Sequence, residues 1–305
     1  MRRAQLFEFC DLPRLPAPLR SLTPTFLSAA FSATRSYTVA ARPLAEALQK
    51  TGARELLDLG SGGAAPLRLV LGELERAHGL RVRALLSDKF PDAAALQIAC
   101  QHSESAGRLS YLVDPVDATA VPRQLTGFRT LFQLLHHFPP PAARAVLQDA
   151  VQAGVGIAVF EVTQRRVLGL LQSLLVPFGV WLFTPFVRPL PLWRLVLTYL
   201  VPVIPLVVFW DALVSTLRSY TPGELEALCT SLVGPRYRWA QGGAWKGGQK
   251  ITWLIGYPDE PAAATRDEPE ADPGASDGPF SLSGPTSGSR QRNVVPRPGS
   301  LSTPT

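Results

Sequence analysis

Short apolar runs alternate with amphipathic segments through the middle of the chain. Such runs are typical of buried strands. They lie at residues 54–59, 81–87, 108–113, 129–135 and 155–162. The segments between them have helical spacing and predict helices over 64–77, 91–105 and 139–152. Strands that alternate with helices form a parallel sheet covered by helices on both faces, so the pattern predicts an α/β fold.

Two further strands are predicted near residues 235–240 and 250–256, joined by a glycine-rich segment at 241–248. This connection is short enough for a hairpin, so we expect the last strand to be antiparallel. Thr221, Pro222 and Glu224 form a capping box with a proline in the first turn, which predicts a helix start. Before the first strand, residues 1–53 are predicted to be an irregular, proline-punctuated lead-in that ends in a helix.

A long uncharged stretch separates the fifth strand from that helix. Val167 to Val187 covers 21 positions without a charge, and Leu195 to Trp210 covers 16 more. At about 1.5 Å per residue, the first run is long enough to cross a ~30 Å hydrocarbon core. The linker between the runs carries Arg188 and Arg194, and prolines interrupt both runs.

Sheet strands lie on both sides of this insert, so the chain must return to the face that it left. Two full spans would place Arg188 and Arg194 outside, which the positive-inside rule disfavours. A kinked hairpin that dips into one leaflet satisfies both conditions and predicts a protein at the cytoplasmic face of the membrane. The alternative interpretation is a buried apolar cap over the active site.

Composition and charge add to this division of the chain. Hydrophobic residues make up 46% and charged residues only 18%, against about a quarter charged in typical soluble domains. Residues 1–54 carry eight Lys and Arg against three acids, which suits an anionic lipid surface. No basic run is interleaved with aromatic residues, so we expect no nucleic-acid partner. The first residues lack the apolar core of a cleaved signal peptide.

The predicted organisation has five parts. They are a lead-in and helix at 1–53, a cofactor-binding core at 54–166, an apolar insert at 167–215, the C-terminal part of the core at 216–258, and a tail at 259–305. The tail is rich in Pro, Ser, Gly, Asp and Thr and is predicted to be disordered.

The chain has three widely spaced cysteines, Cys10, Cys100 and Cys229. They match no metal-binding spacing and indicate ordinary thiols.

The first strand runs directly into a glycine-rich turn, Asp58-Leu59-Gly60-Ser61-Gly62. Such a turn lets a ligand approach the backbone and a helix N-terminus closely. Gly60, Gly62 and Ala65 also satisfy the dinucleotide pattern G-x-G-x-x-A, so NAD(P) is one candidate ligand. The carboxylate of Asp58 would repel a pyrophosphate but suits a positively charged amino group.

Two more acids follow neighbouring strands. Asp88 ends the second strand, where its carboxylate can accept hydrogen bonds from ribose hydroxyls. Asp117 follows the third strand, where it can accept from an adenine amino group. Because the carboxyl ends of parallel strands meet at one edge of the sheet, we expect these acids to share one site.

These residues resemble class I S-adenosylmethionine-dependent methyltransferases. Asp58 to Gly62 looks like the first motif of that family, Asp88 like its ribose-binding acid, and Asp117-Ala118 like its adenine-side motif. The resemblance covers about residues 40–165 and 219–257, and Ala64 departs from a frequent third glycine. With Leu86-Ser87-Asp88-Lys89-Phe90-Pro91 and the apolar insert, the chain looks like a bacterial subgroup of the family.

The resemblance implies a Rossmann-like seven-stranded methyltransferase sheet with helices on both faces and S-adenosylmethionine as cofactor. The cofactor-binding residues that it implies are Asp58, Gly60, Ser61, Gly62, Asp88, Lys89, Asp117 and Ala118.

The adjacent residues His136 and His137 follow the fourth strand, beside the expected reactive methyl group. One of them could take a proton from an acceptor, because histidine titrates near neutral pH; both could instead only position it. Glu161 ends the fifth strand and could orient the substrate or a histidine, or pair with a nearby arginine. Adjacent histidines rarely share one metal, so no metal site is predicted. Tyr220 and Trp245 are weaker candidates for substrate contact.

The sequence thus predicts a membrane-associated S-adenosylmethionine-dependent methyltransferase. Its predicted acceptor is a lipophilic small molecule, because the insert would place the active site where such a molecule partitions. Two alternatives remain. One is an NAD(P)-dependent oxidoreductase, and the other is a non-catalytic membrane-bound protein with a methyltransferase-like fold.

Overall fold

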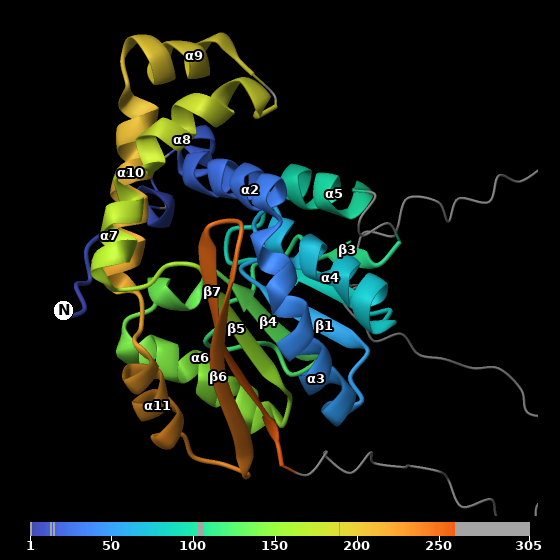
Figure 1. The fold of residues 1–305 in the computed structure, drawn as a ribbon. Coiled ribbons are helices and arrows are strands. Elements are labelled where there is room, and N and C mark those ends of the chain that lie inside the picture. The colour runs from blue at the N-terminus through green and yellow to red at the C-terminus, as the bar shows by residue number, and fades with distance from the viewer. Residues whose placement is uncertain (1, 13, 15, 103–106, 189, 260–305) are drawn as a thin grey trace, which may run out of the picture.

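A seven-stranded mixed sheet forms the centre of the molecule (Figure 1). The computed structural model describes residues 2–12, 14, 16–102, 107–188 and 190–259, so the predicted disordered tail lies outside the described residues except for Asp259. The strand order is β3-β2-β1-β4-β5-β7-β6. Strands β1 to β5 are parallel, and β7 is antiparallel to both β5 and β6. This order is that of the Rossmann-like methyltransferase sheet, so the predicted fold class is confirmed.

The described elements follow the predicted alternation closely. The strands are β1 (Glu55–Leu59), β2 (Arg83–Ser87), β3 (Leu109–Tyr111), β4 (Phe128–Phe132), β5 (Ile157–Glu161), β6 (Tyr237–Lys246) and β7 (Gln249–Pro258). The α-helices are α1 (Ala17–Arg20), α2 (Leu22–Thr34), α3 (Ala41–Thr51), α4 (Ala65–His78), α5 (Ala93–Gln101), α6 (Pro140–Ala153), α7 (Val167–Ser173), α8 (Val176–Phe183), α9 (Leu192–Leu195), α10 (Val203–Arg218) and α11 (Pro222–Thr230). Short 3₁₀ turns are η1 (Phe9–Asp11), η2 (Ser36–Ala40), η4 (Leu135–His137) and η5 (Thr184–Phe186), and η6 (Val196–Leu200) is a π-helical turn.

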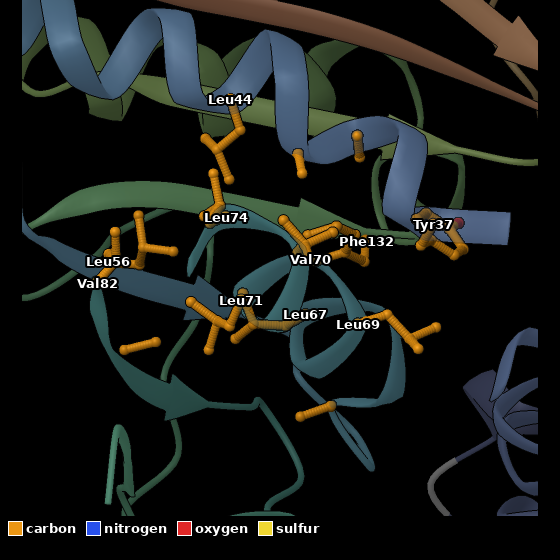
Figure 2. Close-up of a cluster of buried hydrophobic side chains, with 14 of the residues drawn as sticks. Tyr37, Leu44, Leu56, Leu67, Leu69, Val70, Leu71, Leu74, Val82 and Phe132 are labelled. Atoms are coloured by element: carbon orange, nitrogen blue, oxygen red, sulfur yellow. The ribbon is translucent and has the colours of Figure 1, made fainter. Parts of the chain in front are cut away.

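Alternate residues of the strands pack into two hydrophobic clusters, one on each face of the sheet. Leu56 of β1 joins Leu44 of α3 and Val70 of α4 in the first cluster, which Figure 2 shows in close-up. Its neighbour Leu57 packs against α6 in the second cluster, together with Val146. Because side chains alternate across a strand, one short apolar run supplies both faces. The sheet is thus covered on both sides, as the sequence predicts.

The C-terminal hairpin is longer than predicted. Most of the glycine-rich segment belongs to β6, and only Gly247 and Gly248, both with positive φ, make the turn. Gly242 lies opposite Trp253 on β7, and a Cβ at this glycine would lie 2.4 Å from the indole ring. Glycine therefore makes room for an aromatic side chain within the ladder, which composition alone does not distinguish from a loop.

The N-terminal region is also more regular than predicted. Residues 22–34 form helix α2 instead of an irregular lead-in. The prediction missed it because its pattern is interrupted by Pro24 near the first turn, where proline is tolerated. Leu22 and Phe26 of α2 pack with Val180, Ile204 and other insert residues in a third hydrophobic cluster.

The apolar insert forms an arm at one end of the molecule (Figure 1). Helices α7 and α10 run side by side as its two legs, and α8 and α9 form its tip beyond α2. The stretch Val167–Phe186 is long and apolar enough to cross a membrane, and 17% of its apolar window is buried. A second pair, Leu192–Leu200 with Val203–Arg218, is bent by 76°. The large side chains of Val167–Phe186 are mostly exposed, whereas α10 buries Ile204, Val208 and Val214, so the insert has one outward apolar segment and one packed leg.

Candidate active site

The glycine-rich turn joins β1 to α4 at the carboxyl edge of the sheet. Gly60 and Gly62 both have positive φ, and a Cβ at Gly60 would lie 2.7 Å from the Leu134 side chain. The Ser61 backbone N–H donates to the Ser87 carbonyl at 2.9 Å, which ties the turn to the end of β2. Ala64 also adopts a left-handed conformation, φ 51°, just before α4. The position where the resembled family often has glycine therefore has the backbone geometry that favours glycine.

A cavity of about 380 Å³ opens beside this turn. It brings together seven of the eight predicted cofactor residues with both predicted histidines. The lining includes Gly60, Ser61, Gly62, Asp88, Lys89, Asp117, Ala118, His136 and His137. Residues from the ends of three strands and from η4 thus meet in one place, as the edge of a parallel sheet requires.

Asp88 closes one side of the glycine-rich turn. Its Oδ2 accepts a hydrogen bond from the Gly62 backbone N–H at 3.0 Å, and its Oδ1 accepts from the Phe90 N–H at 2.9 Å. Each carboxylate oxygen keeps further acceptor capacity toward the cavity. Asp88 therefore organises the turn and can still receive ribose hydroxyls.

Lys89 and Asp117 form an ion pair at the cavity wall, with Nζ 2.8 Å from Oδ2. Asp117 also accepts from the Thr119 backbone N–H and hydroxyl through Oδ1. The hydrogen bond from Lys89 and those from Thr119 lower the pKa of Asp117 to about 2. The carboxylate is therefore ionised at neutral pH.

Asp58 occupies a different place from the one predicted. Its side chain is buried between β1 and β4, where Oδ1 accepts from the Thr130 hydroxyl at 2.6 Å. Asp58 and Thr130 are register partners on neighbouring strands, so the carboxyl is used within the sheet. It is not among the residues that line the cavity. Burial raises its pKa to about 7, against the opposing hydrogen bonds from Thr130 and Ser61. The Asp58 side chain therefore points into the sheet, and not toward the cavity where the predicted contact with a cofactor amino group would be made.

His136 is buried at the cavity wall and pairs with the half-buried Glu161. Nδ1 of His136 lies 2.7 Å from Oε2 of Glu161, and the His136 backbone N–H donates to Oε1 at 3.3 Å. A carboxylate accepts hydrogen bonds, so Nδ1 carries the proton. Nε2 of His136 is buried and has no hydrogen-bond partner among the described residues. The arrangement fixes the imidazole tautomer in which Nε2 has a free lone pair.

His137 belongs to an ion-paired cluster on the N-terminal segment. Its Nδ1 donates to Oδ1 of Asp11 at 2.8 Å and lies 3.9 Å from Oε2 of Glu8. Burial lowers its pKa, but Asp11 and Glu8 more than offset this and raise it to about 9. His137 is therefore an imidazolium at neutral pH and has no lone pair with which to take a proton. Of the two predicted histidines, the geometry leaves this role to His136.

Arg218 of α10 holds this cluster from the other side. Its Nη1 lies 3.1 Å from Oε1 of Glu8 and 2.5 Å from Oδ2 of Asp11. Glu8, Cys10 and His137 also place potential metal-ligand atoms within 4.8 Å of one another. Glu8 and His137 already have oppositely charged partners, so the described geometry is that of an ion-pair network.

Several cavity residues were not predicted from the sequence. Glu8 and Asp11 come from the N-terminal segment, Thr23 and Phe31 from α2, and Gln133 from the end of β4. Strand β4 ends at Phe132, three residues earlier than predicted. Gln133 follows it and has φ 53° without being glycine. Strained backbone of this kind gathers at functional sites. No motif marks these positions, because they reach the cavity through long-range packing.

Tyr220 and Trp245, the weaker candidates for substrate contact, differ in their distance from the site. Tyr220 lies beside His136 and Glu161 around a small cavity of about 20 Å³. Its hydroxyl donates to the Phe138 carbonyl at 2.7 Å, and the Arg3 guanidinium stacks on its ring at 4.5 Å. Trp245 is exposed on β6 and does not line the main cavity. Tyr220 therefore supports the histidine turn, whereas Trp245 lies apart from it.

No protein-family model and no curated protein matches the sequence. Among solved structures, the chain is similar to human N-acetylserotonin methyltransferase in complex with SAM, with 15% identity and a TM-score of 0.47 over 84% of this chain and 63% of that chain. An O-methyltransferase family protein from Burkholderia thailandensis has 18% identity and a TM-score of 0.39 over 72% and 56%. The mitomycin 7-O-methyltransferase has 15% identity and a TM-score of 0.43 over 78% and 54%. The chain thus spans between 54% and 63% of the length of these three chains. The assignment of the fold rests on the strand order of its own sheet.

Proposed function

We propose that this protein is an S-adenosylmethionine-dependent methyltransferase in which His136 is the general base. The observation that carries the proposal is one cavity lined both by the glycine-rich turn and by His136, whose Nδ1 is paired with Glu161. The predicted cofactor-binding residues and the candidate base thus line the same cavity, on a sheet of methyltransferase topology.

The residues of the cavity fit this cofactor. Asp88 presents ionisable oxygens beside backbone N–H groups of the turn, which suits ribose hydroxyls. Asp117 offers a carboxylate for the adenine amino group, and Gly60 leaves space for close backbone approach. Acids dominate this part of the wall, which disfavours the pyrophosphate of NAD(P). When bound, S-adenosylmethionine supplies an electrophilic methyl group on a positively charged sulfur.

His136 would take the proton of the acceptor through Nε2. Its Nδ1–H remains on Glu161, whose carboxylate stabilises the imidazolium that forms. A positioned base of this kind contributes roughly 10²–10⁴-fold to a rate. The acceptor is therefore a group that must lose a proton as it is methylated, such as a hydroxyl. The remaining residues align the acceptor and exclude water, which is the main task of the protein in such a displacement.

The lipophilic acceptor and the membrane location belong to the same proposal. Helices α2 and α10 line the cavity through Thr23, Phe31 and Ser215, and both also pack in the apolar arm. A hydrophobic acceptor that partitions into a membrane would therefore be close to the cavity wall. The proposal places the protein at the cytoplasmic face of the membrane.

Ligand-induced stabilisation tests the cofactor assignment. S-Adenosylhomocysteine at about 100 times its Kd should stabilise the folded protein by about 2.7 kcal/mol, whereas NAD(P) should have no effect. Stabilisation by NAD(P) alone would identify a dinucleotide-dependent enzyme instead. No stabilisation by either would favour a non-catalytic protein. Transfer of a labelled methyl group to hydrophobic phenols in vesicles, lost in His136→Ala, then tests the reaction.

A further inference from the structure

The outer part of the arm, residues 167–206, has an outward surface that is almost entirely apolar. Large hydrophobic side chains along its whole length are exposed, including Leu175, Phe178, Leu182, Phe186, Leu192 and Leu200. Monomeric soluble proteins rarely expose a contiguous apolar patch larger than a few hundred Å². This surface therefore has a partner, and the contacts of the arm indicate which kind.

Three polar side chains of the arm form hydrogen bonds inside it, whereas the buried hydroxyl of Thr198 has no partner among the described residues. The Trp181 indole N–H donates to the Thr198 carbonyl at 3.1 Å, and the Tyr199 hydroxyl donates back to the Trp181 carbonyl at 2.7 Å. The Thr184 hydroxyl donates to the Val180 carbonyl within its own helix. A protein interface would use such groups for hydrogen bonds to its partner, at about one per 100–200 Å². In a hydrocarbon environment they must bond internally, as they do here.

The charges of the arm fit a lipid surface. Residues 167–206 contain two charged residues, Arg188 and Arg194, and both are cationic. Arg194 is buried and donates to the Val187 carbonyl at 3.1 Å, so its charge lies against backbone. Arg188 is exposed at the tip. An exposed arginine beside apolar side chains suits the phosphate of an anionic headgroup.

Helix α2 limits how far the arm can enter a membrane. Leu22 and Phe26 of α2 pack against Val180 of α8 and Ile204 of α10. One face of the tip is therefore covered by a helix that continues into the cofactor core. The two legs also remain paired, with the Ser173 and Thr216 hydroxyl oxygens 3.3 Å apart. A complete span would require the tip to separate from α2 and break the third hydrophobic cluster.

We propose that the arm docks into the acyl region of one leaflet of an anionic membrane, with α2 as the stop that sets its depth. The occupant of the apolar surface is thus lipid, and the chain lies on the membrane without crossing it. The docking deepens the membrane location given in the proposed function, and the statement that the acceptor enters from this leaflet rests on that function. The docking is independent of the cofactor and of the general base, because it is argued from the arm alone.

Vesicle flotation tests the docking with the full-length chain and without any cofactor. The wild type should float with phosphatidylglycerol-containing vesicles. Leu182→Glu combined with Leu200→Glu should lower the partition coefficient by roughly 10²-fold or more, because two exposed apolar anchors are replaced by charges. Ile98→Glu combined with Val233→Glu is the matched control, since these side chains are comparably exposed but lie outside the arm. Equal losses in both variants, or a wild type that does not float, would overturn the proposal.

Labelling at the tip separates one-leaflet docking from a complete span. Arg188→Cys, compared with wild type to subtract the three native cysteines, should stay unlabelled by a membrane-impermeant maleimide enclosed inside sealed vesicles. Labelling by the enclosed reagent would place residue 188 beyond the far leaflet and overturn the proposal. A stable dimer in lipid-free solution that does not float would identify a second copy as the occupant and would also overturn it.

The outcome can be separated from that of the proposed function. Stabilisation by S-adenosylhomocysteine needs no lipid, so the arm variants should retain it in full, which also shows that they are folded. Deletion of 167–215 is a poorer test. It would remove Asp211, which accepts from the Phe9 backbone N–H at 2.7 Å and from the Thr23 hydroxyl. Loss of membrane binding would then be confounded with loss of the cavity wall.

Discussion

Oε2 of Glu161 lies 2.7 Å from Nδ1 of His136, although the two residues are 25 positions apart in the sequence. The contact exists because β4 and β5 are adjacent parallel strands, so the turn after β4 lies beside the last residue of β5. It fixes the ring orientation and the tautomer of His136, whose ring also lies 4.3 Å from the ring of His137. Glu161 thus acts through His136, as a positioning residue.

Glu161→Gln should therefore lower kcat. The amide keeps the size of the side chain but cannot stabilise an imidazolium, so we expect a loss of roughly 10–10²-fold, below the full contribution of a base. The affinity for S-adenosylhomocysteine should stay unchanged. Glu226→Gln, on the exposed face of α11, is the matched control. An unaltered kcat, or an equal fall in kcat and in S-adenosylhomocysteine affinity, would make the pair purely structural.

The sequence predicted this edge of the sheet well because its signals are local. The alternation of strands and helices predicts a parallel sheet, and Gly60, Gly62, Asp88 and Asp117 lie at or shortly after the ends of predicted strands. Such positions follow from chain connectivity alone. The Glu161–His136 contact was one of the roles considered for Glu161, because both residues end neighbouring strands.

Asp88→Ala should weaken S-adenosylhomocysteine binding by at least tenfold, a loss of about 1.4 kcal/mol or more. The variant loses the acceptor for ribose and also the hydrogen bond that holds the Gly62 N–H. Titration calorimetry measures the change, and the thermal unfolding midpoint without ligand checks that the fold is intact. Asp114→Ala, an exposed acid after β3, should bind as the wild type does. Equal affinities of the two variants would exclude Asp88 from the ribose site.

Gly60→Ala should destabilise the protein more than Gly62→Ala. Both positions have positive φ, which costs an alanine about 1–2 kcal/mol. At Gly60 the new Cβ also meets the Leu134 side chain at 2.7 Å, whereas at Gly62 nothing lies within 4 Å. Overpacking adds about 1–3 kcal/mol of destabilisation, so the free energies of unfolding of the two variants should differ by roughly that amount. Urea unfolding of each variant measures the difference. Equal destabilisation would show that Leu134 moves aside freely.

The part of the site that the sequence did not predict depends on contacts between distant segments. Glu8 and Asp11 reach the cavity because Arg218, more than 200 positions away, pairs with both. Asp58 matches the first motif at its position, yet its partner is Thr130 across the strands. A motif gives the position of a residue but not the orientation of its side chain. That orientation was decided here by the register of β1 and β4.

The ion pair between His137 and Asp11 should make stability depend on pH in a defined direction. The pKa of His137 is raised from 6.5 to about 9, so its stabilising contribution is complete below pH 6.5 and is lost as pH rises through 9. The pKa of Asp11 is lowered from 3.8 to about 2, against the effect of burial, by His137 and Arg218. Its contribution is complete above pH 3.8 and is lost as pH falls through 2. The pair therefore contributes fully between about pH 4 and 6.5.

His137→Gln should accordingly destabilise the protein at pH 6 and have little effect at pH 9.5. At about 1.4 kcal/mol per pKa unit the shift sets an upper limit of about 3 kcal/mol, and partial exposure of the side chain reduces this to roughly 1–2 kcal/mol. Glutamine can still donate to Asp11, so the variant isolates the charge from the hydrogen bond. Urea unfolding of wild type and variant at the two pH values gives the difference directly, with His78→Gln on the last turn of α4 as control. A difference that stays constant between pH 6 and 9.5 would mean that His137 is not charged in the folded protein, and would return it to consideration as a base.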